Sequence, residues 1–225
     1  MPALRRWRRN MYARRSDGTL PTLLMIAGLP ASGKSTVARR LAGVFGMPVL
    51  EKDDLKEALF DTVGFRNYPE KRQLDVAANA VLLRAAGAVL DAGNSLCMVN
   101  NFRADMESGV REFLAAHPCR AGMLFLTGDA DVFWHRYAER DRVGARHIAH
   151  ALPDHYPLLS GEPMPNTVMS RERFREVFEN LGMADFRVDC PSVCVDVTDP
   201  NAVNFDALTD RVSEMLGITK GAEHE

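Results

Sequence analysis

A glycine-rich loop decides the fold class of this chain. It begins at Gly28 and reads Gly-Leu-Pro-Ala-Ser-Gly-Lys-Ser-Thr. An apolar run over residues 23–27 precedes it, and a stretch with helical periodicity at Val37, Leu41 and Phe45 follows it. This is the G-x-x-x-x-G-K-[ST] pattern between a strand and a helix, where backbone N–H groups surround a polyphosphate at the helix N-terminus. The sequence therefore predicts a nucleoside triphosphate site.

Each residue type in the loop has a chemical reason. Glycine lets the backbone turn its N–H groups inward, Lys34 can reach the β- and γ-phosphates, and the Ser35 hydroxyl can complete a Mg²⁺ shell. Lys34 is accordingly also a predicted catalytic residue. The loop residues predicted to bind ATP are Gly28, Ala31, Ser32, Gly33, Lys34, Ser35 and Thr36.

Length and composition limit the class of protein. A chain of 225 residues fits one domain with a substantial core, and its 46% apolar and 26% charged residues are ordinary for a globular protein. No apolar run reaches about 18 residues, so we expect no membrane span. The start lacks the apolar core of a signal peptide, and four cysteines are too few for a disulfide framework, so we expect a cytoplasmic protein.

The N-terminal segment, residues 1–20, is rich in arginine. The first 15 residues contain six arginines, with Trp7 and Tyr12 among them, and could bind a nucleic-acid backbone. The other interpretation is a solvated arm, which the net charge of −2 favours because the rest of the chain shows no matching basic pattern. We therefore expect residues 21–219 to form a single domain and residues 220–225 to be a loose tail.

Strands and helices alternate along the domain. Apolar runs predict five strands, at 23–27, 47–50, 96–99, 121–127 and 192–197. Amphipathic stretches predict one helix directly after the glycine loop and a short helix that ends at about residue 60. Further helices are predicted at 69–92, 105–116, 129–142, 170–181 and 202–216. This order predicts an α/β fold of the P-loop NTPase type, with a five-stranded parallel sheet covered by helices on both faces.

Two acidic residues just past the second predicted strand favour a kinase over other P-loop proteins. Asp53 and Asp54 lie at the carboxyl end of a parallel strand, where ligands of open α/β sheets bind. A carboxylate there can orient a substrate hydroxyl and accept its proton. Asp53 is the favoured base, Asp54 is the alternative, and either could instead cap the following helix. The guanine-specific pattern Asn-Lys-x-Asp is absent from the sequence.

Arginines after the fourth predicted strand suggest a lid over the γ-phosphate. Arg136 and Arg140 are spaced i, i+4 on one helix and so share a face, and Arg146 follows in an irregular segment. A mobile arginine lid, expected at about 135–166, would supply positive charge and exclude water during phosphoryl transfer. Arg136 and Arg140 are therefore candidate catalytic residues, and Arg140 and Arg146 candidate ATP ligands. The alternative is a solvated helix.

These motifs resemble the small P-loop kinases of the AAA-domain predicted-kinase type, relatives of polynucleotide kinase, chloramphenicol phosphotransferase and zeta toxins. The resemblance spans about residues 22–200 and is carried by the glycine loop, by the segment Lys-Asp-Asp-Leu-Lys at 52–56, and by the segment from Arg140 to His150. It implies that Asp53 is the catalytic base. It also implies that Lys56 stands where an arginine often contacts substrate or phosphate.

The chain departs from that family pattern at the end of the third strand. Such kinases commonly have an aspartate there, whereas this chain has Asn100, followed by Asn101 and Arg103. An asparagine does not neutralise Mg²⁺, so the metal would rely on Ser35, phosphate oxygens and water. Alternatively, Asn100 and Arg103 form part of the acceptor pocket, together with Asp53 and Lys56.

The sequence thus predicts an ATP- and Mg²⁺-dependent kinase that acts on a hydroxyl of a small metabolite or natural product. Two other functions stay open. The arginine-rich arm would suit a polynucleotide 5′-hydroxyl kinase, although nucleic acid is not the favoured partner. The asparagine at the third strand would suit a nucleotide-binding switch or adaptor with little turnover. The sequence does not identify the acceptor or the oligomeric state.

Overall fold

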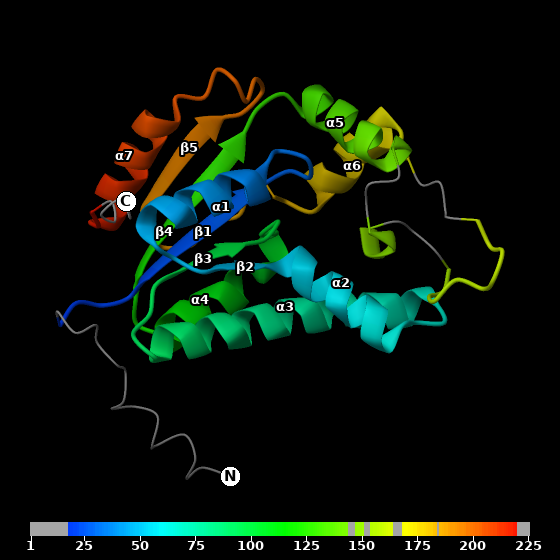
Figure 1. Ribbon diagram of the computed structural model, residues 1–225, viewed down its shortest axis with the longest axis horizontal. Helices are drawn as coiled ribbons and strands as arrows, with labels where there is room; N and C mark the ends of the chain where they lie inside the picture. Colours follow the sequence, from blue (N-terminus) through cyan, green and yellow to red (C-terminus); the bar gives the residue numbers. More distant parts are fainter. Residues whose placement is uncertain (1–17, 144–146, 151–153, 164–167, 184, 220–225) are drawn as a thin grey trace, which may run out of the picture.

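The computed structural model describes residues 18–143, 147–150, 154–163, 168–183 and 185–219. They contain a five-stranded sheet in the order β2-β3-β1-β4-β5, with every neighbouring pair parallel (Figure 1). The strands are β1 (Thr22–Gly28), β2 (Val49–Glu51), β3 (Leu96–Val99), β4 (Arg120–Thr127) and β5 (Ser192–Asp196). The predicted α/β fold with a five-stranded parallel sheet is confirmed.

Helices cover both faces of the sheet, as Figure 1 shows. Helices α1 (Lys34–Phe45) and α7 (Phe205–Leu216) pack on one face, and α3 (Tyr68–Asp91) and α4 (Glu107–Ala116) pack on the other. Strand β1 lies at the centre, so its side chains alternate between the two layers. Leu24 and Ile26 join the cluster with α1 and α7, whereas Leu23 and Met25 join the cluster with α3 and α4. This burial on both faces explains why the strand reads as a continuous apolar run.

The remaining helices stand beyond the carboxyl ends of the strands. Helix α2 (Lys52–Val63) follows β2 directly and packs against α3, with Phe60 and Phe65 in edge-to-face contact between them. Helices α5 (Ala130–Arg142) and α6 (Arg171–Asn180) pack together on the opposite side (Figure 1). The end of the sheet that carries the glycine loop is therefore flanked by α2 on one side and by α5 and α6 on the other.

The bounds of the elements differ from the sequence prediction where local chemistry intervenes. Strand β2 begins at Val49, after Pro48, which has no N–H to donate to a ladder. Helix α7 begins three residues later than predicted because the Asn204 side chain caps it, accepting a hydrogen bond from the N–H of Ala207 at 3.0 Å. The predicted helix at 105–116 begins with a 3₁₀ turn at Ala104–Met106. The irregular segment at 143–166 contains a further 3₁₀ turn at Ile148–His150, called η4.

Helix α3 is long and apolar enough to cross a membrane by length and composition alone. In the fold, however, one face of it is buried against the sheet and α2, with Leu74, Ala78, Leu82, Ala86 and Leu90 in the core. Their spacing of four residues is that of a helix packed on a core.

Candidate functional site

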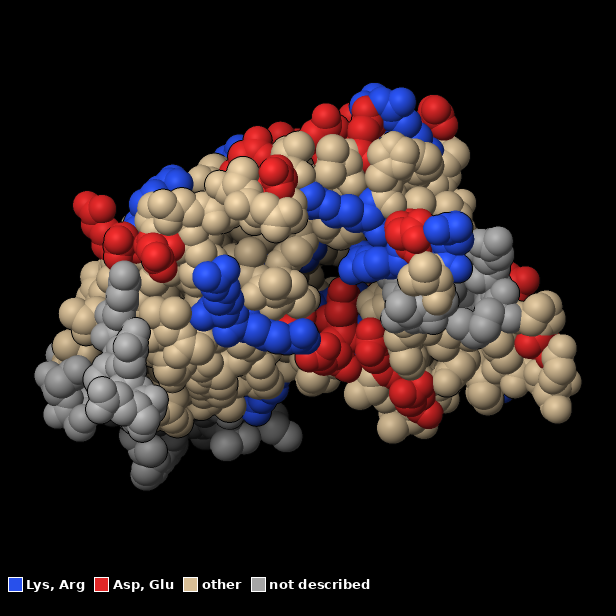
Figure 2. Space-filling model, turned by 45° about the horizontal axis from the view of Figure 1, so that its top comes forward, with Lys and Arg blue, Asp and Glu red and all other residues tan. Residues whose placement is uncertain are grey.

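A cavity of about 290 Å³ lies at the carboxyl ends of β1, β2 and β3. Figure 2 shows a hollow in the middle of one face of the molecule, with Lys and Arg side chains and Asp and Glu side chains gathered around it. Segments far apart in the sequence meet in the cavity. Its lining is Pro30, Ala31, Gly33, Lys34, Ser35, Thr36, Glu51, Lys52, Asp53, Lys56, Val99, Asn100, Asn101, Tyr137, Arg140, His150, Met169 and Phe178.

The glycine loop has the backbone of a phosphate cradle. Gly28, Ala31 and Gly33 have φ values of 154°, 64° and 88°, and helix α1 begins directly after Gly33 without a side-chain cap. A Cβ on Gly28 would lie 2.8 Å from the carbonyl oxygen of Leu126, so only glycine fits there. The first N–H groups of α1 are thus left for an anion.

Two polar side chains of the loop suit a phosphate ligand. The ammonium group of Lys34 donates to the carbonyl oxygens of Gly28 and Leu29 at 2.9 and 3.0 Å, so it lies across the mouth of the loop. The hydroxyl of Ser32 is buried and has no hydrogen-bond partner among the described residues. A buried polar atom normally has a partner, and a phosphate oxygen in the cradle would provide one. The loop therefore fits the polyphosphate that its sequence predicts.

Asp53 reaches this cavity from the first turn of α2. The helix begins at Lys52 with Glu51 in the capping position, so the alternative that Asp53 caps the helix is wrong. Burial by itself raises the pKa of Asp53, but the positive charges of His150, Lys52, Lys34 and Lys56 together outweigh it and hold the pKa below its ordinary value. About half of the side-chain surface, 52%, is still exposed to solvent. Asp53 is therefore ionised at neutral pH and accessible to a ligand.

Asp54, the alternative base, is exposed and lies outside the set of described residues that line the cavity. Burial raises the pKa of Asp54, the carboxylate of Glu51 raises it further, and Arg39 opposes both. The structure thus separates the two adjacent carboxylates, with only Asp53 turned to the cavity.

The acidic residue that sequence reasoning missed is Glu51. It ends β2, is 5% exposed, lines the cavity, and pairs with the guanidinium group of Arg39 on α1 at 2.9 Å. Its position at the carboxyl end of a parallel strand was the available signal. Its carboxylate lines the same cavity as Ser35, where Asn100 of the neighbouring strand offers only an amide.

Asn100 lines the cavity and is held in place by its neighbours. Its amide nitrogen donates to the side-chain oxygen of Asn79 on α3 at 2.9 Å, and its own oxygen accepts from the N–H of Asn101 at 2.8 Å. Arg103, by contrast, pairs with Asp105 through two contacts of 3.0 and 2.7 Å and is absent from the cavity lining in the described part of the chain. The geometry therefore supports Asn100, and not Arg103, as a residue of the pocket that binds the phosphate acceptor.

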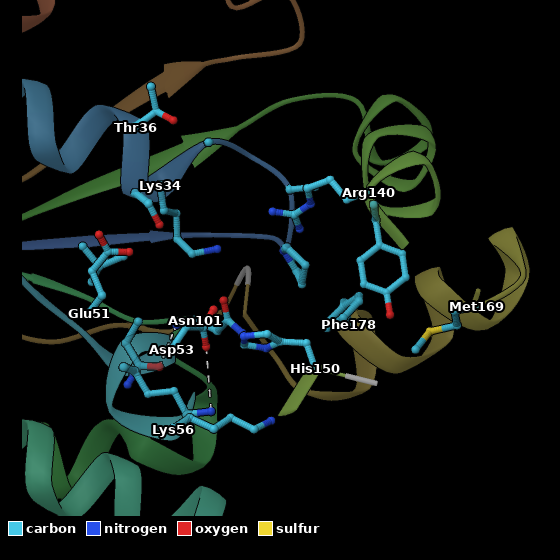
Figure 3. A pocket seen from close by; sticks show the side chains of 18 residues that line it. Lys34, Thr36, Glu51, Asp53, Lys56, Asn101, Arg140, His150, Met169 and Phe178 are labelled. Atoms are coloured by element: carbon cyan, nitrogen blue, oxygen red, sulfur yellow. Dashed lines mark hydrogen bonds and ion pairs between the residues drawn. The ribbon is translucent and has the colours of Figure 1, made fainter. Parts of the chain in front are cut away.

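The two arginines of α5 have different surroundings despite their i, i+4 spacing. Arg140 lines the cavity, and Figure 3 shows its guanidinium group and the ammonium group of Lys34 extending into the space from opposite sides. Arg136 instead donates to the carbonyl oxygens of Val197 and Thr198 at 3.0 and 2.6 Å, and so holds the segment after β5. It is not among the described residues that line the cavity, which leaves its predicted catalytic role without support. Arg146 lies outside the described residues.

The segment after α5 also contributes to the site. His150, in η4, lines the cavity and lies with its Nε2 atom 2.7 Å from the carboxylate of Glu57 on α2. His147 contacts Asp61, one turn further along α2, at 3.0 Å. Tyr137, on α5, also lines the cavity. Met169 and Phe178 line it on the side of α6 (Figure 3). Sequence reasoning missed these contacts because no spacing pattern links them.

Comparisons with known proteins identify the family and the fold of the chain. A family model described as "AAA domain" matches residues 23–152, which is more than half of the chain. No curated protein sequence matches the chain.

Solved structures share the fold over nearly the whole length. A proposed kinase from Chloroflexus aurantiacus j-10-fl is 26% identical, with a TM-score of 0.72 over 88% of this chain and 100% of that one. Kti12 from Chaetomium thermophilum, solved with ADP-AlF3, is 18% identical, with a TM-score of 0.53 over 86% and 98%. A gluconokinase from Sinorhizobium meliloti 1021 is 20% identical, with a TM-score of 0.50 over 88% and 93%. The chain is thus a P-loop domain of a kinase-like fold.

Proposed function

We propose that this chain, which belongs to the AAA domain family, is an ATP- and Mg²⁺-dependent kinase acting on a hydroxyl group of a small metabolite or natural product. The observation that carries the proposal is that one cavity joins the phosphate loop, with Lys34 and Ser35, to an ionised carboxylate at Asp53. Phosphoryl transfer needs these two parts, a positively charged cradle and a group that aims the acceptor oxygen, and little else from the protein.

The nucleotide would bind with its phosphates in the glycine loop. The N–H groups at the start of α1 would donate to phosphate oxygens, and the Lys34 ammonium would leave the carbonyl oxygens of Gly28 and Leu29 for the γ-phosphate. Arg140 faces the same space and would meet the charge that develops on the transferred group.

The oxygen donors of the cavity fit Mg²⁺. The ion prefers hard oxygen ligands and keeps several of its waters, so the Ser35 hydroxyl and the Glu51 carboxylate, the latter through water, would suffice with the phosphates. When bound, Mg²⁺ neutralises part of the phosphate charge. Glu51 would thereby replace the aspartate that is missing at Asn100.

Asp53 would act on the acceptor. Its carboxylate accepts a hydrogen bond from the acceptor hydroxyl and directs the oxygen toward the γ-phosphorus. As the new oxygen–phosphorus bond forms and the bond to the β-phosphate oxygen breaks, the hydroxyl proton passes to Asp53 and ADP leaves. A carboxylate with a lowered pKa is a weak base, so we assign it mainly an orienting role, with the proton transferred late.

The test compares Asp53→Asn with Asp54→Asn. The first variant keeps the shape and removes the charge, so nucleotide should bind with near-normal affinity while turnover falls by about 10²–10⁴-fold. Asp54→Asn is the matched control, because the adjacent carboxylate lies outside the cavity lining, and its turnover should change by less than about tenfold. Single-turnover kinetics and calorimetric titration with ATP measure both quantities. Normal turnover in both variants would show that the mechanism is wrong.

Two features of the sequence would suit other functions, and each alternative has its own experiment. The arginine-rich segment within residues 1–17 would suit a polynucleotide 5′-hydroxyl kinase, and salt-dependent binding of an oligonucleotide would reveal it. Asn100, in place of a carboxylate, would suit a nucleotide-binding protein with little turnover. ADP production that does not respond to any hydroxylated acceptor would favour that second alternative.

A further inference from the structure

Helices α2 and α3 bring a group of charged side chains together next to the cavity. Lys52 and Lys56 are one turn apart on α2, and Lys71 and Asp75 are one turn apart on α3. The ammonium groups of Lys52 and Lys56 lie 3.2 and 2.9 Å from the same carboxylate oxygen of Asp75. Lys52 also lies 4.0 Å from the carboxylate of Asp53. Two of the three lysines, Lys52 and Lys56, line the cavity.

These lysines are deeply buried for their type. Lys56 and Lys71 are 8% and 4% exposed, whereas lysine is rarely buried to this degree unless it is paired. Burial lowers the pKa of Lys56, and Lys52 lowers it further, while Asp75 opposes both. Burial likewise lowers the pKa of Lys71 to about 8, with Lys56 adding to the effect. Burial is thus the main reason why the pKa of each lysine is lowered, and the charge of a neighbouring lysine adds to it.

In the described part of the chain, the ammonium groups of Lys52 and Lys56 share the carboxylate of Asp75, and Lys52 also contacts the carboxylate of Asp53. The neighbouring acid Glu57 lies against His150, and Glu51 pairs with Arg39. An anionic group entering the cavity would meet Lys52 and Lys56 directly and would also be attracted by Lys71.

We propose that Lys52 and Lys56, supported by Lys71, form an anion subsite, so that the acceptor carries a carboxylate or a phosphate group beside its reacting hydroxyl. The proposal rests on the proposed kinase function. Because Lys52 reaches to 4.0 Å from Asp53, the acid group of the acceptor lies close to the hydroxyl that Asp53 aims. The acceptor class is therefore a small hydroxy acid or a phosphorylated alcohol.

The experiment uses three probes that share one alcohol skeleton: glycerate, glycerol 3-phosphate and glycerol. Each is titrated by calorimetry into the full chain saturated with Mg²⁺ and a non-hydrolysable ATP analogue, so that the glycine loop is already filled. We expect glycerate or glycerol 3-phosphate to bind about tenfold or more tightly than glycerol. Whichever of the two acids binds more tightly identifies the anionic group that the subsite prefers.

Two variants test whether the lysines cause the tighter binding of the acids. Lys56→Gln should remove most of the difference between the acids and glycerol. Arg72→Gln is the matched control, because it removes the same charge from an exposed residue of α3 that adjoins Lys71, and it should keep the preference. Binding of the ATP analogue to each variant confirms its fold and its loop.

The outcomes separate the two proposals. Equal binding of all three probes to the wild-type protein, with the analogue bound normally, would overturn the anion subsite and leave the kinase function intact. Survival of the acid preference in Lys56→Gln would equally overturn this subsite. Failure of the analogue to bind wild type at all would overturn the proposed function and the subsite with it.

Discussion

Replacing Lys71 by methionine should make the protein more stable while weakening its hold on an acidic acceptor. Lys71 lies in the first turn of α3, is 4% exposed, and has the ring centroid of Phe65 6.0 Å from its ammonium group. Burial, and next to it the charge of Lys56, lowers the pKa of Lys71 from 10.5 to about 8. Methionine fills similar space without a charge, so the cost of burying the ammonium disappears.

The magnitude follows from the difference in the pKa of Lys71 between the folded and unfolded chain. A fall from 10.5 to about 8, at about 1.36 kcal/mol for each pKa unit, corresponds to about 3 kcal/mol of lost stability at neutral pH. A lysine stem can shift its charge toward solvent, so we expect Lys71→Met to recover about 1–3 kcal/mol. For a domain of this size the Tm should rise by about 3–10 °C.

The lowered pKa of Lys71 also determines how the free energy of unfolding changes with pH. Below about pH 8 the lysine is protonated in both the folded and unfolded chain, and the full penalty on stability is present. Between about pH 8 and 10.5 the unfolded chain binds more protons than the folded chain, so this residue's contribution to stability rises with pH. The advantage of Lys71→Met over wild type should therefore be largest at pH 7 and shrink toward pH 10.

Urea unfolding of wild type, Lys71→Met and the exposed control Arg72→Gln at pH 7 and pH 10 measures these differences. Arg72→Gln should stay within about 0.5 kcal/mol of wild type. A loss of stability in Lys71→Met at pH 7, or an advantage that does not change with pH, would refute the reasoning. The same variant should bind the acidic probes less tightly than wild type, which would explain why a destabilising lysine occupies this position.

Three further substitutions test the phosphate cradle and the two arginines of α5. Lys34→Ala should abolish phosphoryl transfer and leave the free energy of unfolding nearly unchanged, because the ammonium group faces the loop and not the core; retained turnover, measured as ADP release, would contradict the phosphate-loop assignment. Arg140→Ala should lower kcat by about 10²-fold with a much smaller effect on ATP affinity. Arg136→Ala should mainly reduce the Tm, because its guanidinium group holds the backbone after β5; an equal loss of kcat in both arginine variants would show that Arg136 also acts in the site.

The fold could be predicted because its signals are local. Neighbouring residues encode the continuous apolar run of β1, the glycine loop after it and the amphipathic stretch of α1. The alternation of strands and helices along the chain then predicts the parallel sheet. Asp53 could be predicted as well, because it follows a strand whose carboxyl end must lie beside the loop.

The rest of the site could not be predicted, because it depends on contacts between distant segments. The i, i+4 spacing of Arg136 and Arg140 indicates a shared helix face, but it does not reveal that the carbonyl groups after β5 capture one of them. Arg103 is an exception, because the acid that pairs with it and keeps it from the acceptor pocket, Asp105, lies only two residues later in the chain. Lys71 is a single lysine in the sequence, and its pKa is lowered only when the fold buries it and places Lys56 nearby.

The most direct test of phosphoryl transfer to a small acidic alcohol is mass spectrometry of a metabolite extract incubated with the protein and Mg·ATP. We predict that at least one hydroxylated acid of the extract gains a phosphoryl group with the wild-type chain, and that neither Asp53→Asn nor Lys34→Ala produces it. If no compound gains a phosphoryl group while wild type and Asp53→Asn release ADP at the same rate, the chain is not a kinase of this mechanism.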